Sequence, residues 1–181
     1  TARGLLAELI EKAQEKNEDP LVAEQVAVAA IKYMMLRQAP GGDIVFDPEK
    51  SLSLEGDSGP YLQYALVRAK TVLEKAPQET HIIYDMHAGT KEKEGIPQEP
   101  YLLERLIMRF GEVAARAERE CAPHHVTQYL TQLAGEWNSF YAQERIIGGA
   151  YEPYKLLIAR AFATTMENGL HILGIPTPER M

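Results

Sequence analysis

Four side chains that could hold an unpaired nucleobase recur at helical spacing. They are two tyrosines followed by two cations, at positions i, i+3, i+7 and i+14 of one predicted helix: Tyr61, Tyr64, Arg68 and Lys75. Proteins stack unpaired bases on aromatic rings and hold the adjacent phosphates with guanidinium and ammonium groups. The same spacing also fits a structural role. In that role both rings pack against a neighbouring helix, and only their hydroxyl groups reach the edge of the packed surface.

The run Gly-Asp-Ser-Gly just before this stripe resembles the nucleophile segment of trypsin-like serine proteases. A serine nucleophile needs a histidine base held by an acid. In that family both residues precede the serine, whereas the first histidine here, His81, follows Ser58. Ser58 instead precedes Pro60, and proline is favoured in the first helical turn after a capping residue. Ser58 is therefore predicted to cap a helix, and no catalytic residue is assigned.

The histidines do not predict a metal site. His81, Asp85 and His87 come nearest to a ligand cluster, but a spacing of six puts the two histidines on different faces of a helix. No second cluster completes a tetrahedral set. His124 and His125 fall in the first turn of a predicted helix, where a solvated or capping role is expected.

Composition restricts the classes of function. With 181 residues and 45% hydrophobic content, the chain can form one domain or two small helical subdomains that share a core. Its 26 acidic and 19 basic residues give a net charge of −7, which argues against a general polyanion binder but leaves room for a local RNA site. The single Cys121 excludes an internal disulfide, fits a reducing compartment, and is expected to be at least half-buried.

No apolar run approaches the roughly 18 residues of a membrane span, and no signal peptide is visible. We therefore expect a cytoplasmic protein without a membrane partner, and a monomer.

Helical periodicity dominates, so the predicted fold class is all-α, a helical bundle of about six to seven helices. Prolines and glycines mark most of the boundaries. The predicted helices are residues 5–13, 21–36, 60–76, 100–117, 123–140 and 153–173, with a further short one at 82–87. Residues 37–59 should form an irregular connector with a brief extended piece at 44–46.

Three separated segments resemble the C-terminal half of arginyl-tRNA synthetases. The first is VAVAAIKYMML. The second runs from FDPEK through Pro-Tyr-Leu-Gln-Tyr, with Arg68 four residues later, to TVLEKA. The third runs from LTQLAGEWNSFY to the terminal LGIPTPERM. Together they cover essentially the whole chain in the family's order. The residues of the second segment that match the family pattern are Phe46, Glu55, Gly56, Pro60, Tyr61, Gln63, Tyr64 and Arg68.

The resemblance implies an anticodon-binding domain of the class I synthetase type. Residues 1–45 would be junction helices that follow a catalytic domain, and residues 46–181 the anticodon-binding bundle. The family's His-Ile-Gly-His and Met-Ser-Lys signatures are absent from these 181 residues. The chain is therefore expected to be the C-terminal part of an arginine–tRNA ligase, inactive alone. ATP and Mg²⁺ would be used by the catalytic domain, with no cofactor held here.

The resemblance also implies a partner, the anticodon stem and loop of tRNA-Arg. Tyr141 and Met181 would help to form the pocket for the central anticodon cytosine, with Arg180 beside them. Asn138 lies one turn before Tyr141, and its amide could bond a base edge or satisfy a loop. With the stripe residues, the predicted tRNA-binding set is Tyr61, Tyr64, Arg68, Asn138, Tyr141, Arg180 and Met181.

Two alternatives remain open from the sequence. One is a helical protein-interaction module, which the acidic balance and the alanine-rich second helix fit equally well. The other is the anticodon-binding domain of a different class I synthetase, such as the cysteine or leucine enzyme. The Tyr-Tyr-Arg stripe and the terminal Pro-Glu-Arg-Met favour the arginine enzyme.

Overall fold

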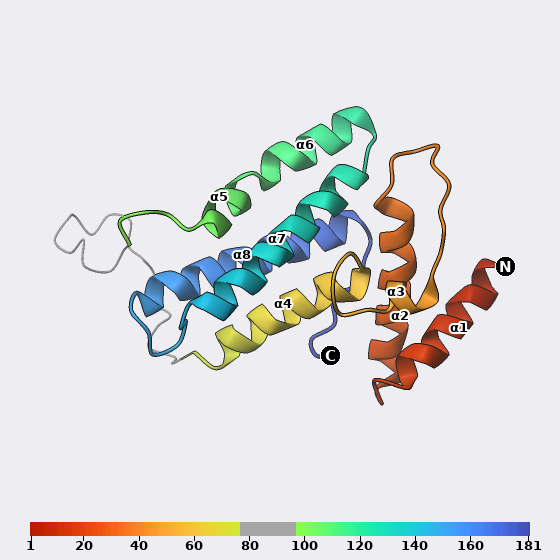
Figure 1. Cartoon of the computed structure of the whole chain (residues 1–181), viewed down its shortest axis with the longest axis horizontal. Coiled ribbons are helices and arrows are strands. Elements are labelled where there is room, and N and C mark those ends of the chain that lie inside the picture. The colour runs from red at the N-terminus through yellow and green to blue at the C-terminus, as the bar shows by residue number, and fades with distance from the viewer. Residues whose placement is uncertain (77–96) are drawn as a thin grey trace.

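The computed structural model describes residues 1–76 and 97–181, and within them it contains helices and no strand (Figure 1). The predicted all-α fold class is confirmed. The described residues form eight helices, more than the six to seven expected: α1 (Ala2–Gln14), α2 (Pro20–Leu36), α3 (Pro48–Ser51), α4 (Gly59–Glu74), α5 (Leu102–Met108), α6 (Phe110–Glu120), α7 (His124–Gln143) and α8 (Glu152–Ile172). The predicted helix at 82–87 and the His81, Asp85 and His87 cluster lie outside the described residues.

Local capping explains where the helices that carry the site begin and end. The hydroxyl oxygen of Ser58 accepts a hydrogen bond from the backbone N–H of Tyr61 at 3.0 Å, which confirms Ser58 as the cap of α4. Asp19 and Asp47 cap α2 and α3 in the same way. Beyond α8 the chain turns at Gly174, whose φ of +63° lies in the left-handed region that favours glycine.

Three expectations about local structure were wrong. The helix predicted over 100–117 is two helices, α5 and α6, because the N–H of Arg109 bonds to the carbonyl of Leu106, three residues back, and tightens the turn between them. The apolar periodicity continues through this turn, so the sequence pattern could not reveal it. The connector predicted over 37–59 contains the short helix α3, which begins after the Asp47 cap. Cys121, expected to be at least half-buried, is exposed because it ends α6 in the left-handed conformation with φ +49°.

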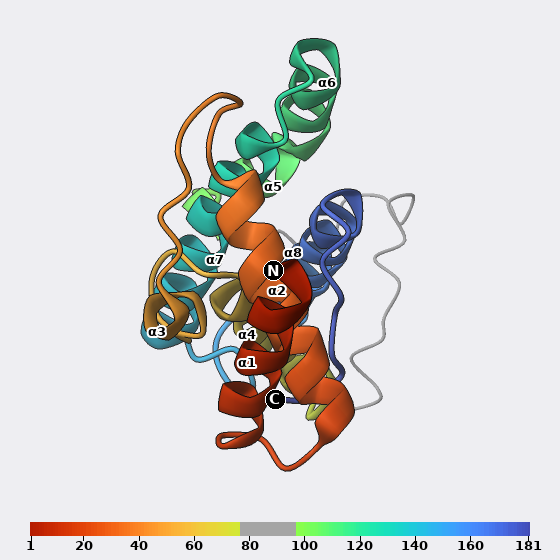
Figure 2. The same cartoon turned by 90° about the vertical axis from the view of Figure 1, so that its right-hand side faces the viewer.

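The helices bury two apolar cores. The larger lies among α4, α5, α7 and α8, and includes the stack of Trp137 on Phe162 at 4.6 Å between ring centroids. The smaller lies between α1 and α2, which form a hairpin at one end of the molecule (Figures 1 and 2). Helix α2 contributes to both cores. The division into 1–45 and 46–181 stays a prediction.

Helix α4 crosses α2 at very short range. A Cβ atom added to Gly59 would lie 2.2 Å from the carbonyl oxygen of Ala29 in α2, so only glycine permits this approach. The crossing fixes the start of α4 against the hairpin and sets the orientation of the face that carries Tyr64 and Arg68.

Candidate nucleic-acid interface

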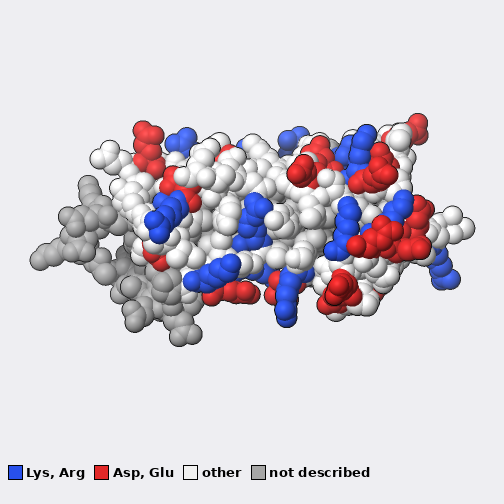
Figure 3. Space-filling model, turned by 60° about the horizontal axis from the view of Figure 1, so that its bottom comes forward, with Lys and Arg blue, Asp and Glu red and all other residues white. Residues whose placement is uncertain are grey.

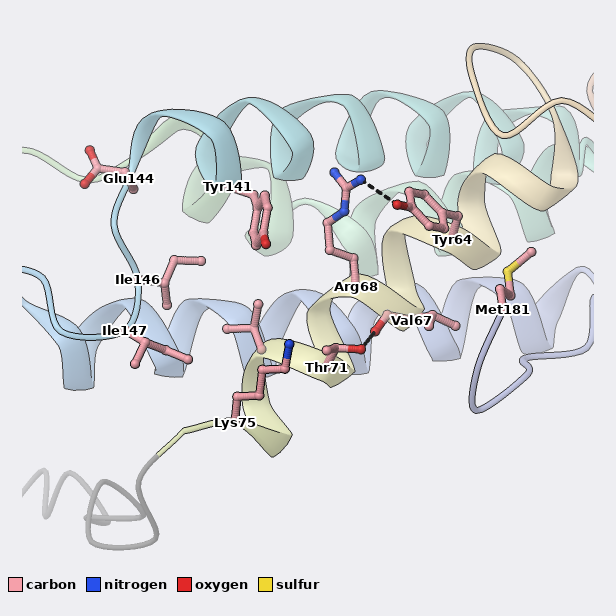
Figure 4. Close-up of a pocket in the computed structure, with 11 residues that line it drawn as sticks. Tyr64, Val67, Arg68, Thr71, Lys75, Tyr141, Glu144, Ile146, Ile147 and Met181 are labelled. Carbon is pink, nitrogen blue, oxygen red and sulfur yellow. Dashed lines mark hydrogen bonds between the residues drawn. The ribbon is translucent and has the colours of Figure 1, made fainter.

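An open groove of about 530 Å³ runs along α4 between the end of α7 and the C-terminal tail. Figure 4 shows the side chains that project toward it from α4, from the end of α7 and from the tail. Its lining is part aromatic, part cationic and part aliphatic: Tyr64, Val67, Arg68, Thr71, Val72, Lys75, Tyr141, Glu144, Ile146, Ile147 and Met181.

The guanidinium group of Arg68 lies against two tyrosine rings. Its Cζ atom is 4.7 Å from the ring centroid of Tyr64 and 5.1 Å from that of Tyr141, both within cation–π range. One of its nitrogens also donates to the Tyr64 hydroxyl oxygen at 2.9 Å (Figure 4). The side chain of Tyr141 is 43% exposed. A flat ligand in the groove can therefore reach an aromatic face beside a fixed cation.

Asn138 orients this arrangement from α7. Its Oδ1 accepts from Arg68 at 3.1 Å, and its Nδ2 donates to the hydroxyl oxygen of Tyr61 at 3.0 Å. The amide thus joins two side chains of α4, and neither satisfies a loop nor lines the groove. Tyr61 packs against the larger core with its hydroxyl bonded to Asn138, which is the structural role left open for it in the sequence.

The C-terminal tail brings Met181 but not Arg180 to the groove. Met181 lines the same groove as Tyr141, and Figure 4 shows Tyr64 and Arg68 between the two. The side chain of Arg180 is exposed and is not part of the lining.

The described side chains that line the groove are net positive, because the one acidic side chain among them is paired. Glu144 lies 2.6 Å from the ammonium group of Lys155, whose side chain is only 4% exposed. Arg68 and Lys75 remain as the cations of the lining. On the face shown in Figure 3, acidic side chains gather toward the end where α1 lies, whereas basic side chains are spread across the middle.

Several lining residues were not predicted from the sequence. Val67 and Thr71 lie on the same face of α4 as Tyr64 and Arg68, so helical spacing could have identified them. Glu144, Ile146 and Ile147 follow the end of α7, where no periodic signal exists, and only the fold brings them to the groove.

The described residues contain neither a metal-binding cluster nor a membrane-spanning helix. Residues 1–76 and 97–181 contain no group of three or more His, Cys, Asp or Glu side chains that could hold a metal ion. In the same ranges, none of the helices has the length and apolar character needed to cross a bilayer.

The chain is similar in sequence and in fold to known proteins. It is 35% identical over 172 residues to the arginine–tRNA ligase of Thermococcus kodakarensis, an alignment that covers 93% of this chain and 26% of that protein. The arginine–tRNA ligase of Vibrio vulnificus is 36% identical over 181 residues, covering 97% and 30%. The structure of Thermus thermophilus arginyl-tRNA synthetase superposes with a TM-score of 0.79 and 31% identity, over all of this chain and 32% of that one.

This chain therefore spans about a quarter to a third of the length of the relatives it matches. The resemblance to arginyl-tRNA synthetases is confirmed by these alignments. A protein-family model, the DALR anticodon binding domain, matches residues 62–181, which is more than half of the chain and includes the groove from Tyr64 to Met181. The chain belongs to the DALR anticodon-binding domain family.

Proposed function

We propose that this chain binds the anticodon stem and loop of tRNA-Arg and positions it for arginylation by a catalytic domain of the same protein. The observation that carries the proposal is the Arg68 guanidinium held against Tyr64 and Tyr141 at an open groove. The family match and the arginine–tRNA ligases among the relatives support it.

In this proposal the groove receives an unpaired anticodon base. The exposed ring of Tyr141 offers a stacking face, and Arg68 and Lys75 supply positive charge for a base edge or a phosphate. Hydrogen bonds to Tyr64 and Asn138 fix Arg68 before any ligand arrives. Less side-chain entropy is then lost on binding, which favours affinity.

The contribution to catalysis is positional. Holding the anticodon end in register places the acceptor end of the tRNA at the catalytic domain, and such alignment supplies a large part of enzymatic rate enhancement. ATP and Mg²⁺ would act in that domain. The 181-residue chain alone is expected to give no arginine-dependent ATP–pyrophosphate exchange.

A titration with three RNAs tests the proposal. The chain is titrated with tRNA-Arg, with tRNA-Arg carrying a changed central anticodon base, and with an unrelated tRNA, at two salt concentrations. We expect tRNA-Arg to bind most tightly. With two cations in the groove, the slope of log K against log salt should be only about −1.4, the value for two contacts to a single strand. Equal affinity for all three RNAs would mean charge attraction alone and would refute the proposal.

Substitution of Tyr141 tests the site itself. Tyr141→Ala should weaken tRNA-Arg binding by about 1–3 kcal/mol, the cost of losing one stacked base, whereas Tyr141→Phe should keep most of the affinity because it keeps the ring. Tyr151→Ala is the matched control, since Tyr151 is similarly exposed at 39% but lies outside the groove. An unchanged affinity for Tyr141→Ala, with the helical circular dichroism intact, would remove Tyr141 from the site.

A further inference from the structure

A glutamine from the Pro-Tyr-Leu-Gln-Tyr motif is buried completely in the fold. Gln63 lies in α4 with no exposed surface. Its Nε2 donates to the carbonyl oxygen of Pro176 at 2.7 Å and to that of Gln25 at 3.2 Å, while its Oε1 has no hydrogen-bond partner. Burial of an amide is unfavourable unless it is hydrogen-bonded, and an apolar side chain of similar volume would fill the space without that cost. The bonds that Gln63 donates are therefore the reason for an amide at this position.

The hydrogen bond to Pro176 is one of three polar contacts described here between the C-terminal tail, residues 174–181, and helices α2 and α4. Upstream of it, the ammonium group of Lys32 in α2 donates to the carbonyl oxygen of Gly174. Downstream, the ammonium group of Lys70 in α4 lies 3.2 Å from Glu179 and 2.8 Å from Glu167 of α8. The three contacts follow one another along the tail. Of the three side chains that donate to it, that of Gln63 is the one that is fully buried.

The tail held in this way ends at the groove. Met181 lines the groove on one side and packs on the other against the smaller core between α1 and α2. Its position depends on the path of the tail, because residues 174–181 follow the last turn of α8 and form no helix of their own. A tail released from α4 would open the groove at this end.

We propose that Gln63 is a positioning residue for base recognition. It does not touch the RNA, but it fixes the tail so that Met181 forms a wall of the groove. This inference rests on the proposed function, since it concerns the specificity of the same site.

Gln63→Met is the first variant, because methionine has a similar volume and no donor. The variant loses both hydrogen bonds of the amide, and the one to Pro176 is the one that holds the tail. Its loss should reduce the discrimination between tRNA-Arg and the RNA with the changed central base by about fivefold. Lys70→Met loosens the tail from the surface and provides a second variant if Gln63→Met is poorly folded. Lys12→Met is the control, since it removes the same charge from an exposed pair with Glu8 on α1.

A double-variant comparison separates an effect through the tail from a general loss of stability. Removal of residues 177–181 should reduce discrimination, and Gln63→Met should then add nothing further, because both changes act through one element. The ¹³C-methyl NMR signal of Met181, assigned with Met181→Leu, should narrow and move toward its random-coil position in Gln63→Met without RNA.

The outcomes distinguish the two proposals. Failure of the wild-type chain to discriminate among the RNAs refutes the proposed function, whatever the tail does. The positioning role alone is overturned if Gln63→Met and Lys70→Met discriminate between the RNAs as well as the wild type does. It is also overturned if this discrimination survives removal of residues 177–181. Additive losses from Gln63→Met and the truncation overturn it as well, because Gln63 would then act elsewhere.

Discussion

The crossing of α2 and α4 at Gly59 gives the sharpest stability prediction. In Gly59→Ala, the new Cβ would lie 2.2 Å from the carbonyl oxygen and 2.4 Å from the carbonyl carbon of Ala29, whereas ordinary contact begins at 3.4 Å. Both atoms belong to backbone within a helix, so no side-chain rotation relieves the clash. The two helices must separate by about 1 Å, and a gap of that size already forfeits a quarter to a half of each contact's dispersion energy.

We expect Gly59→Ala to lower the free energy of unfolding by about 2 kcal/mol. Overpacking costs roughly 1–3 kcal/mol, occasionally more, and the clash with backbone places this site at the upper end. The smaller chain entropy of alanine in the unfolded state returns about 0.4–1 kcal/mol. For a chain of this length, 1 kcal/mol corresponds to about 2–4 °C, so the Tm should fall by about 6 °C.

Thermal unfolding followed by circular dichroism measures this change. Gly111→Ala in α6 is the matched control, because outside the adjacent backbone of its own helix no atom lies within 4 Å of the added Cβ. It should leave the Tm unchanged or raise it slightly, since alanine is favoured over glycine in a helix by about 0.5–1 kcal/mol. A Tm for Gly59→Ala within about 2 °C of the wild type, which is under 1 kcal/mol, would refute the close-contact argument.

Two further changes test the buried polar groups. Glu144→Gln leaves the ammonium group of Lys155 buried without a countercharge, so it should lower the free energy of unfolding in urea by about 2 kcal/mol. Glu8→Gln breaks the exposed pair with Lys12 and is the control, with an expected loss below about 0.5 kcal/mol. Burial raises the pKa of Tyr129 from 10.0 to about 12, so its contribution to stability is complete below pH 10 and is lost as the pH rises toward 12. Tyr129→Phe should therefore flatten the fall in Tm over that range, although its lost hydrogen bond to a backbone carbonyl should cost about 1 kcal/mol at neutral pH.

Helix boundaries were predictable where the signal is local. Ser58 and Pro60 are adjacent in sequence to the turn that they stabilise, so the start of α4 followed from their types alone. The break between α5 and α6 has no such signal. Its tight turn at Arg109 carries no proline, and both helices continue the same apolar periodicity, so tertiary packing decides it.

The residues of the candidate site were likewise predictable only where the signal is local. Tyr64 and Arg68 share a helix, and their spacing alone predicted that they would meet. Tyr61 lies three residues before Tyr64, a spacing that also predicts contact, but its hydroxyl bonds to Asn138, 77 positions away. The sequence pattern contains no sign of that partner. Arg180 was expected beside Met181. In a tail without helical structure, consecutive side chains tend to point to opposite sides, so adjacency in sequence does not mean a shared groove.

The net charge of −7 does not conflict with an RNA site of this kind. Non-specific affinity for RNA grows with the number of cations that reach phosphates, and the described residues of the lining offer two, Arg68 and Lys75. Pairing with Lys155 prevents Glu144, the one acidic side chain among the described lining residues, from cancelling them. In the proposed site, charge would thus contribute little affinity, and what remains would be stacking on Tyr141 beside a guanidinium that is already in place. Because stacking needs an unpaired base and phosphate contact does not, a site built in this way favours an anticodon loop over duplex RNA even on an acidic protein.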